Sequence, residues 1–283
     1  MILFVILKDC VKISYIKRYF PNWKGMDEMT EKKPYGTVLI KASKILDYLS
    51  TIEEGAILKK IAHEAEMTAS TTLKILDTLL LIGYVSRNES DKTYSLGPTL
   101  AKYSSRFFDH SLLKNNASPI LENLQTKVDE TIHLGILNGI ELIYVDKLEP
   151  KHQSIFMSSK VGMSRPLYST GMGKIFLSDF SEAELANYFS KVTLETYTEK
   201  TITNKFLLIK ELANIRETEV AYDDEEMEKD CFCIAMPING RDGIEGAFSV
   251  SMPKFRGTDE NVTYVIAEMK KAKEEIEAKI QQY

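Results

Sequence analysis

The stretch MTASTTLKILDTLLLIGYV, residues 67–85, decides the fold of the N-terminal third of the chain. Thr68 is a good N-cap residue and Gly83 stands at a natural C-cap position, which predicts one helix between them. Leucines at helical spacing mark the side of this helix that we expect to face a core, namely Leu73, Leu76 and Leu80. The opposite side carries short polar groups and one lysine.

Two helical patterns precede this segment, over residues 38–49 and 58–65, and a short turn separates the second pattern from the third helix. Two short strands follow it, over residues 84–88 and 92–96. Three short helices followed by a two-stranded ribbon predict a winged helix-turn-helix. In that motif the third helix reads DNA.

Short polar side chains and cations can approach phosphates and base edges without steric conflict. The expected DNA contacts are Thr68, Ser70, Thr71, Thr72, Lys74 and Thr78, together with Arg87 and Lys92 of the ribbon. Residues 37–97 hold seven basic and eight acidic residues, so this domain is not basic overall. Periodicity alone therefore leaves open an ordinary polar face that meets only water.

The chain as a whole has 283 residues, enough for two ordinary domains, and a net charge of −5. Without a global basic field, binding to nucleic acid must rest on a local surface. Three cysteines cannot form a disulfide framework, which fits a reducing, cytoplasmic location. The apolar start, MILFVILKDC, is too short for a membrane helix and lacks the features of a signal peptide.

The second half of the chain alternates strands and helices, which predicts an α+β domain with an antiparallel sheet. We expect an interruption at Asn115-Asn116 and a new helix starting at Ser118-Pro119. Expected strands cover residues 131–137, 141–148, 154–159, 231–238 and 245–252. Expected helices cover residues 171–178, 182–189 and 204–217 and a C-terminal stretch that starts at Thr258.

The predicted organisation has four parts. Residues 1–33 form an unassigned N-terminal extension, 34–97 the winged helix-turn-helix, 98–114 a linker helix and 115–283 the second domain.

Three segments resemble the IclR (isocitrate lyase regulator) family of bacterial and archaeal transcription factors. They are residues 67–85 with YSLGPTL (94–100), RPLYSTGMGKIFLS (165–178) and VAYDDEEMEKDCFCIAMPINGRDGIEGAFSVSMPKFR (220–256). The resemblance covers about residues 37–280. It implies a winged helix-turn-helix joined to a GAF-like effector domain, a homodimer or homotetramer, and near-palindromic operator DNA.

The resemblance also implies a pocket for a small organic acid or aromatic metabolite in the second domain. Backbone N–H groups of Gly171 and Met172 would face a carboxylate at a helix N-terminus. Asp223 and Cys233 match the family's acidic and cysteine positions. The remaining expected lining residues are Ser249 and Ser251, which alternate on the last strand, and Met157, Arg165 and Leu167 at the rim.

The run DDEEMEKDCFC, residues 223–233, divides by position. We expect Asp223 and Cys233 to face the ligand, and Cys231 to cap its strand or face outward. Asp224, Glu225 and Glu226 are expected to hold the loop or face water. Two positions depart from the resemblance: Asp230 replaces a glycine, where its charge is expected to alter the loop or ligand preference, and Lys74 replaces a frequent arginine.

Two other classes of protein stay open at this point. A metal-responsive regulator would use Cys233 and nearby acids, although Cys231 and Cys233 lack the CxxC spacing of zinc sites and are not expected to share one metal. A cysteine-dependent enzyme would need a histidine base, and no histidine has a recognisable catalytic signature. We therefore expect a regulator with no catalytic residues, no metal and no cofactor, which represses or activates transcription.

Overall fold

The structure is a computed structural model that describes residues 35–52, 54–103, 112–155, 157–241 and 243–281. Two compact units divide the chain near residue 110. The predicted N-terminal extension lies outside the described residues, as do residues 104–111 of the predicted linker helix. Residues 99–103 of that linker are helical.

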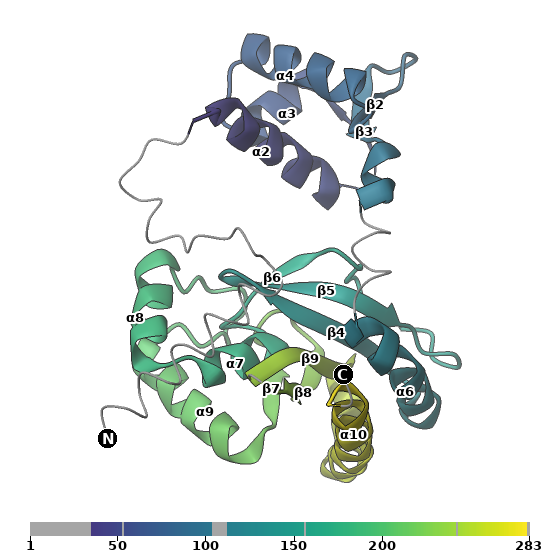
Figure 1. The fold of residues 1–283 in the computed structure, drawn as a ribbon, viewed down its shortest axis with the longest axis vertical. Coiled ribbons are helices and arrows are strands. Elements are labelled where there is room, and N and C mark those ends of the chain that lie inside the picture. Colours follow the sequence, from purple (N-terminus) through teal and green to yellow (C-terminus); the bar gives the residue numbers. More distant parts are fainter. Residues whose placement is uncertain (1–34, 53, 104–111, 156, 242, 282–283) are drawn as a thin grey trace. The chain divides into compact units, whose positions relative to one another are not determined.

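The N-terminal unit is the predicted winged helix-turn-helix (Figure 1). Its helices are α2 (Thr37–Thr51), α3 (Leu58–Glu64) and α4 (Ala69–Leu81). Its sheet has the order β1 (Ala56–Ile57), β3 (Thr93–Leu96) and β2 (Val85–Arg87), all antiparallel. The two-residue strand β1, too short to show a pattern, was not predicted.

Helix α4 begins and ends where the sequence predicts. The Thr68 hydroxyl oxygen accepts a hydrogen bond from the backbone N–H of Thr71 at 3.3 Å, and Gly83 adopts a left-handed φ of 75°. The buried face, however, is Thr72, Ile75, Leu76 and Leu79. The prediction that Leu73 faces the core is wrong, because the helix is rotated so that Leu73 is 39% exposed.

The C-terminal unit contains one antiparallel six-stranded sheet in the order β6-β5-β4-β9-β8-β7. Its strands are β4 (Thr131–Asn138), β5 (Glu141–Leu148), β6 (Ser164–Pro166), β7 (Ala221–Asp224), β8 (Cys231–Gly240) and β9 (Gly243–Pro253). Alternate residues of each strand point to opposite faces, so Ala235 joins the core under α7 while Ile234 is buried on the other face.

Helices cover both faces of this sheet. On one side lie α7 (Gly171–Asp179), α8 (Glu182–Lys191) and α9 (Lys205–Thr218); on the other lie α6 (Leu112–Val128) and α10 (Asp259–Ile280) (Figure 1). Helix α10 follows a short 3₁₀ turn, Lys254–Arg256, and is capped by Thr258. This α+β arrangement confirms the predicted fold class.

Two sequence expectations are wrong in the C-terminal unit. Helix α6 runs without interruption through Asn115-Asn116 and holds Pro119 in its interior, because its apolar face is buried along its whole length. The described residues of 154–159 form no strand; instead β6 pairs with β5 a few residues later. Among the described residues, no helix is both long and apolar enough to cross a membrane.

Candidate functional site

The exposed face of α4 carries most of the residues expected to contact DNA. Ser70, Lys74 and Thr78 are exposed, and Thr71 is half-buried beside the N-cap. The Thr78 hydroxyl donates to the carbonyl of Lys74 at 3.1 Å, and Lys74 is the one cation among these four residues. A cation and short hydroxyls on one exposed helix face suit a groove of DNA.

Thr72 does not belong to that face. Its side chain is fully buried and its hydroxyl donates to the carbonyl of Thr68 at 3.0 Å, which ties the first turn of α4 to the core. The two ribbon residues lie apart from α4 in sequence: Lys92 is exposed at the turn with a φ of 56°, and the Arg87 guanidinium lies 5.5 Å from the centre of the Tyr94 ring.

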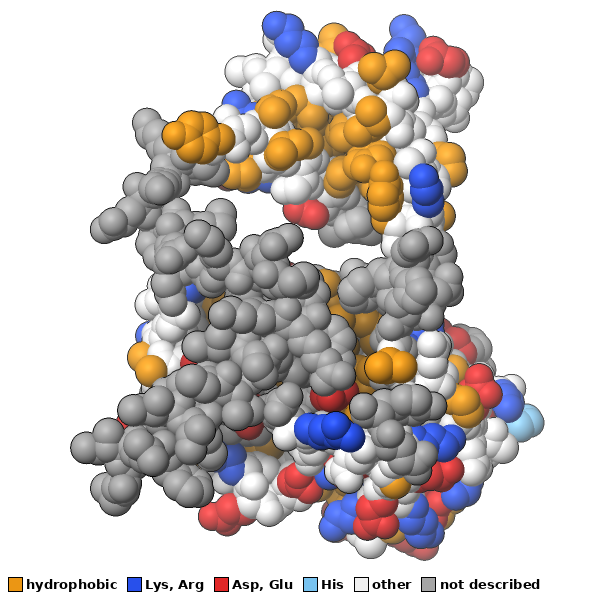
Figure 2. All heavy atoms as spheres, viewed as in Figure 1, with side chains coloured by type: hydrophobic (Ala, Val, Ile, Leu, Met, Phe, Trp, Pro, Cys, Tyr) orange, Lys and Arg blue, Asp and Glu red, His pale blue; other side chains and the backbone are white. Residues whose placement is uncertain are grey.

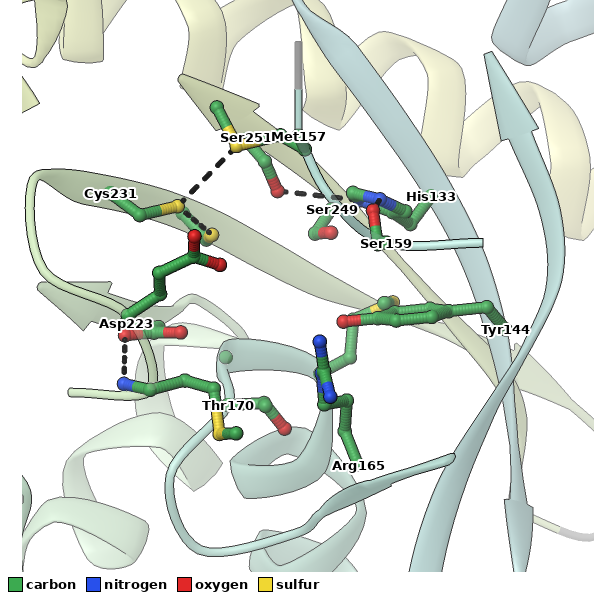
Figure 3. A pocket seen from close by; sticks show the side chains of 15 residues that line it. His133, Tyr144, Met157, Ser159, Arg165, Thr170, Asp223, Cys231, Ser249 and Ser251 are labelled. Carbon is green, nitrogen blue, oxygen red and sulfur yellow. Dashed lines mark hydrogen bonds between the residues drawn. The ribbon is translucent and has the colours of Figure 1, made fainter. Parts of the chain in front are cut away.

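A cavity in the C-terminal unit gathers eight of the nine residues expected to line an effector pocket (Figure 3). It lies between the α7 side of the sheet and the N-terminus of α7. The ninth residue, Leu167, is fully buried in the hydrophobic core instead. The lining residues are His133, Tyr144, Met157, Ser159, Arg165, Thr170, Gly171, Met172, Asp223, Met227, Glu228, Cys231, Cys233, Ser249 and Ser251.

Strand register explains why residues far apart in sequence meet in this cavity. Asp223 stands opposite Cys233, which stands opposite Ser251, and directly opposed residues of antiparallel strands share a face. Two residues earlier on β9, and therefore on the same face, Ser249 stands opposite His133 of β4. Three neighbouring strands and β7 thus present one polar wall to the cavity.

The structure corrects the expected direction of Cys231. Cys231 and Cys233 are two residues apart on β8, and such residues point to the same face of a strand. Both side chains therefore line the cavity, with their Sγ atoms 3.6 Å apart. Cys231 neither caps the strand nor faces outward.

His133 is held neutral at the centre of the polar wall. Its Nε2 lies 2.6 Å from the Ser159 hydroxyl and its Nδ1 lies 3.3 Å from the Ser251 hydroxyl. Its ring stacks on Tyr144 at 4.7 Å between ring centres. Burial, helped by the nearby charges of Lys147 and Arg165, lowers the pKa of His133 to about 3, so it adds no positive charge at neutral pH.

Asp223, on β7, is the buried acid of the same polar wall. Burial raises its pKa to about 7, although its Oδ1 accepts backbone N–H bonds from Glu226 at 2.8 Å and Met227 at 3.2 Å. At neutral pH it is therefore present both as an acid and as a carboxylate. The protonated form can donate a hydrogen bond to an oxygen of a ligand.

The three acids after Asp223 hold the loop, as expected. Glu226 is buried and accepts from the fully buried Nζ of Lys174 at 2.5 Å. Asp224 forms ion pairs with Lys254 and Lys200, and Glu225 pairs with Lys200. Of the two expected roles, holding the loop and facing water, the buried Glu226 has the first.

Arg165 and the first turn of α7 form the side of the cavity that favours negative charge. The first intrahelical bond of α7 runs from the N–H of Lys174 to the carbonyl of Thr170. The N–H groups of Gly171 and Met172 precede it and point out of the helix end, where the helix dipole also attracts an anion. Both of these residues and Arg165 line the cavity.

Seven lining residues were not predicted from the sequence: His133, Tyr144, Ser159, Thr170, Met227, Glu228 and Cys231. The alternation of residues along β4 and β8 would have supported His133 and Cys231, once the pairing of β4 with β9 was known. The others come from loops or from β5. No group of three or more His, Cys, Asp or Glu residues at metal-binding distance occurs in the described part of the chain.

Comparisons with known proteins find family models that match both units. A family model of the bacterial transcriptional regulator IclR C-terminal domain matches residues 106–278, and an IclR helix-turn-helix model matches residues 38–89. The chain is 30% identical to the HTH-type transcriptional regulator KdgR of Escherichia coli K12, over 86% of this chain and 92% of that protein.

Solved structures agree with these matches. The IclR crystal structure from Thermotoga maritima is 33% identical with a TM-score of 0.66, covering 87% of this chain and 99% of that one. An IclR homologue from Microbacterium hydrocarbonoxydans, complexed with 4-hydroxybenzoate, shares the fold with a TM-score of 0.71 at 22% identity, covering 86% of this chain and 98% of that one.

Proposed function

The chain belongs to the IclR family of DNA-binding transcriptional regulators, and from this premise we propose that a small organic acid bound in its C-terminal cavity controls its binding to operator DNA. Its relatives are regulators and not enzymes. The winged helix-turn-helix binds DNA. The ligand, its site and its effect on DNA binding are the proposed part.

One observation carries the proposal for the ligand. Arg165 and the N–H groups at the start of α7 line the cavity together, and the sheet wall of the same cavity holds a neutral histidine and an acid that is half-protonated near pH 7. A carboxylate would meet one full positive charge, a helix N-terminus and hydrogen-bond donors.

The hydroxyls of the sheet would fix the rest of the ligand. Ser249 and Ser251 are both buried and point to the same cavity, and Ser251 is already bonded to His133. Tyr144 adds a ring face and a hydroxyl. The solved relative with 4-hydroxybenzoate supports a ligand that combines a carboxylate with a hydroxyl or an aromatic ring.

For DNA, we propose that Ser70, Thr71, Lys74 and Thr78 contact the operator from α4, with Thr68 at its N-terminus and Arg87 and Lys92 from the ribbon. The exposure of these residues supports the assignment, although Thr71 is half-buried. The buried Thr72 is not among them, and we propose that it holds the helix in place. DNA binding also supports the proposal that the protein acts in the cytoplasm.

We further propose a homodimer or homotetramer. Figure 2 shows hydrophobic side chains gathered on the face of the N-terminal unit that carries α2. Val38, Leu39 and Ile40 at the start of that helix are 53%, 72% and 48% exposed. A two-fold pair of winged helices matches two half-sites of a near-palindromic operator. The ligand would act by binding unequally to the two arrangements of such a pair.

The test uses the full-length protein with the double substitution Ser249→Ala and Ser251→Ala. A thermal-shift screen with pyruvate, other small carboxylates and 4-hydroxybenzoate identifies an acid that binds the unchanged protein, and promoter DNA of the neighbouring genes supplies the operator. We expect the double variant to bind that acid roughly tenfold or more weakly, about 1.4 kcal/mol or more, and to bind operator DNA as before without the acid.

Ser190→Ala is the matched control, because Ser190 is exposed on α8 and its hydroxyl bonds only the carbonyl of Asn187 in its own helix. It should change neither binding event. If no acid in the screen binds, or if the double variant binds the acid normally, the proposed ligand site is wrong. If the double variant also loses DNA binding, the proposed separation of the two sites is wrong.

A further inference from the structure

Sulfur is concentrated in the cavity of the C-terminal unit. Five of the fifteen lining residues carry it: Met157, Met172, Met227, Cys231 and Cys233. Three of these atoms are in direct contact, since Cys231 Sγ lies 3.6 Å from Cys233 Sγ and 3.7 Å from Met157 Sδ (Figure 3). We call Met157, Cys231 and Cys233 the sulfur cluster. The proposed binding of an organic acid uses Met157 and Cys233 only as parts of the wall and leaves the contacts among the three sulfur atoms unexplained.

The fold holds all three sulfur atoms in place. The two cysteines stand two residues apart on β8, which is paired on both sides by β9 and β7, so both side chains point to the cavity. Met157 comes from the segment before β6. The Lys147 ammonium fixes that segment by donating to the carbonyls of Met157 and Ser159, each at 2.7 Å. Lys147 has only 9% of its side chain exposed, so this anchor is itself rigid.

The spacing of the sulfur atoms matches shared coordination of one metal ion. With metal–sulfur bonds of about 2.3 Å, two ligands of a trigonal or tetrahedral ion lie roughly 3.8–4.0 Å apart. The two separations that involve Cys231 Sγ, 3.6 and 3.7 Å, fall within a few tenths of an ångström of that value. A side-chain movement of this size would admit an ion.

The donor set selects a soft ion. Two thiolates and a thioether suit Cu(I), whereas a thioether is a poor ligand for harder ions such as Zn²⁺ or Mg²⁺. The harder donors nearby are engaged with the protein: His133 lies between two serine hydroxyls, and Asp223 accepts two backbone N–H bonds. We infer that the sulfur cluster is a binding site for a soft monovalent cation such as Cu(I), held by Cys231 Sγ, Cys233 Sγ and Met157 Sδ.

Binding would release the two thiol protons to solvent and change no oxidation state. The resulting site carries one net negative charge, and Arg165 in the same cavity offsets it. Met157 and Cys233 line the cavity in both proposals, but no sulfur atom is a hydrogen-bond partner in the proposed recognition of an organic acid, so the cation site does not depend on that proposal. The cavity would then bind two kinds of ligand, an organic acid and a soft cation.

The test measures Cu(I) affinity of the full-length protein under anaerobic, reducing conditions. All proteins carry Cys10→Ser, which removes the one other thiol of the chain. A chromogenic Cu(I) chelator competes for the ion, and the expected result is one tightly bound Cu(I) per chain. Cys231→Ser and Cys233→Ser should each weaken binding by roughly 100-fold or more, because loss of an outer partner alone weakens metal sites roughly 10–100-fold.

Met157→Leu keeps the size of the side chain and removes one sulfur, and should weaken binding by roughly tenfold or more. Met163→Leu is the matched control, because Met163 packs against the hydrophobic core and not in the cavity, and it should bind Cu(I) normally. X-ray absorption of the Cu(I) complex should show three sulfur neighbours at about 2.3 Å.

Thermal unfolding without copper verifies that each variant is folded. If Cys233→Ser does not fold, Cys231→Ser carries the test, since Cys231 is the first residue of β8, whereas Cys233 is paired with residues on both sides. Unchanged Cu(I) affinity in folded Cys231→Ser, absence of tight binding in the starting protein, or a copper site of nitrogen and oxygen ligands would each overturn the inference. Binding of the organic acid is measured separately and does not bear on these outcomes.

Discussion

Lys74 and Lys174 occupy opposite environments in two helices that both serve binding sites. Lys74 is exposed on α4, among hydroxyls that meet solvent. Lys174 is fully buried on α7, where its Nζ bonds Glu226 at 2.5 Å and lies 3.8 Å from Glu211. The backbone N–H of Glu226 in turn bonds Asp223 in the cavity wall.

The difference in burial distinguishes residues that bind a partner from residues that stabilise the fold. An exposed charge interacts weakly with its own protein and stays available to a partner such as DNA. A buried charge is tolerated only with its partner in place, so its substitution is felt first in stability. We therefore expect variants of the α4 face to change DNA affinity and variants of the buried pair to change folding.

The largest effect should follow Lys174→Met, which leaves Glu226 buried without its partner. The free energy of unfolding should fall by about 3–5 kcal/mol, as expected when one member of a buried ion pair is removed. Urea unfolding followed by circular dichroism measures it. Lys174→Met combined with Glu226→Leu should recover most of the loss, and Lys74→Met is the exposed control. A loss below about 0.5 kcal/mol in the single variant would contradict a structural role for the pair.

The second effect concerns pH and Asp223. Its pKa of about 7 in the folded protein is above the ordinary value near 3.9, so the folded state keeps a proton that the unfolded chain loses. Its stabilising contribution is complete below about pH 4 and is lost as pH rises to about 7. The asparagine of Asp223→Asn does not titrate, so this variant lacks the pH-dependent contribution to stability.

The measurement is therefore the difference in unfolding free energy between Asp223→Asn and the unchanged protein. It should increase in favour of the variant between about pH 4 and pH 7 and then level off. Taking the difference removes the opposite contribution of His133, whose pKa of about 3 makes stability rise as pH increases toward 6.5. A difference that stays constant with pH would mean that Asp223 titrates normally.

The third effect concerns the exposed lysine, Lys74, and the affinity for operator DNA. Lys74→Ala should weaken operator binding by roughly tenfold or more, lower the salt dependence of binding by about one phosphate contact and leave stability within about 0.5 kcal/mol. Binding to promoter DNA at several salt concentrations measures it. Lys270→Ala on α10 removes an equally exposed lysine from the other unit and should not change DNA affinity. Equal losses in the two variants would point to net charge alone.

The same contrast explains which parts of the molecule the sequence could predict. The helices and most strands follow local patterns, and Thr68, Gly83 and Thr258 mark helix ends where the structure has them. Leu73 shows the limit, because a leucine-rich helix fits more than one rotation about its axis. The very short strand β1 and the segment before β6 have no periodicity of their own, and only pairing with neighbouring strands defines their structure.

Predicting the residues that line the cavity depends more on long-range strand register than predicting the helices and strands does. Cys231 follows from strand alternation alone, and the sequence interpretation placed it wrongly by not applying that rule as it was applied to Ser249 and Ser251. His133 is different, since its place beside Ser249 requires the pairing of β4 with β9, more than a hundred residues apart. Family resemblance supplied what local pattern could not, and it supplied only the residues that the family shares.

Asp230 gives the smallest expected effect and tests the one position where this chain departs from the family's glycine. Its backbone is left-handed, with a φ of 61°, which explains why a glycine suits the position. Its N–H donates to Glu225 and its carbonyl accepts from Lys254, so the turn depends on the backbone. The side chain is exposed and lies outside the cavity lining, so its charge does not contact the cavity directly.

We expect Asp230→Gly to raise the free energy of unfolding by up to about 1 kcal/mol. Relief of the left-handed strain, roughly 1–2 kcal/mol, exceeds the extra chain entropy of glycine, roughly 0.5–1 kcal/mol. Asp230→Ala removes the same charge without relieving the backbone and should not be stabilised. Affinity for the organic acid should be the same in both variants, because the turn bonds persist; a change shared by both would show that the charge, and not the backbone, matters at this position.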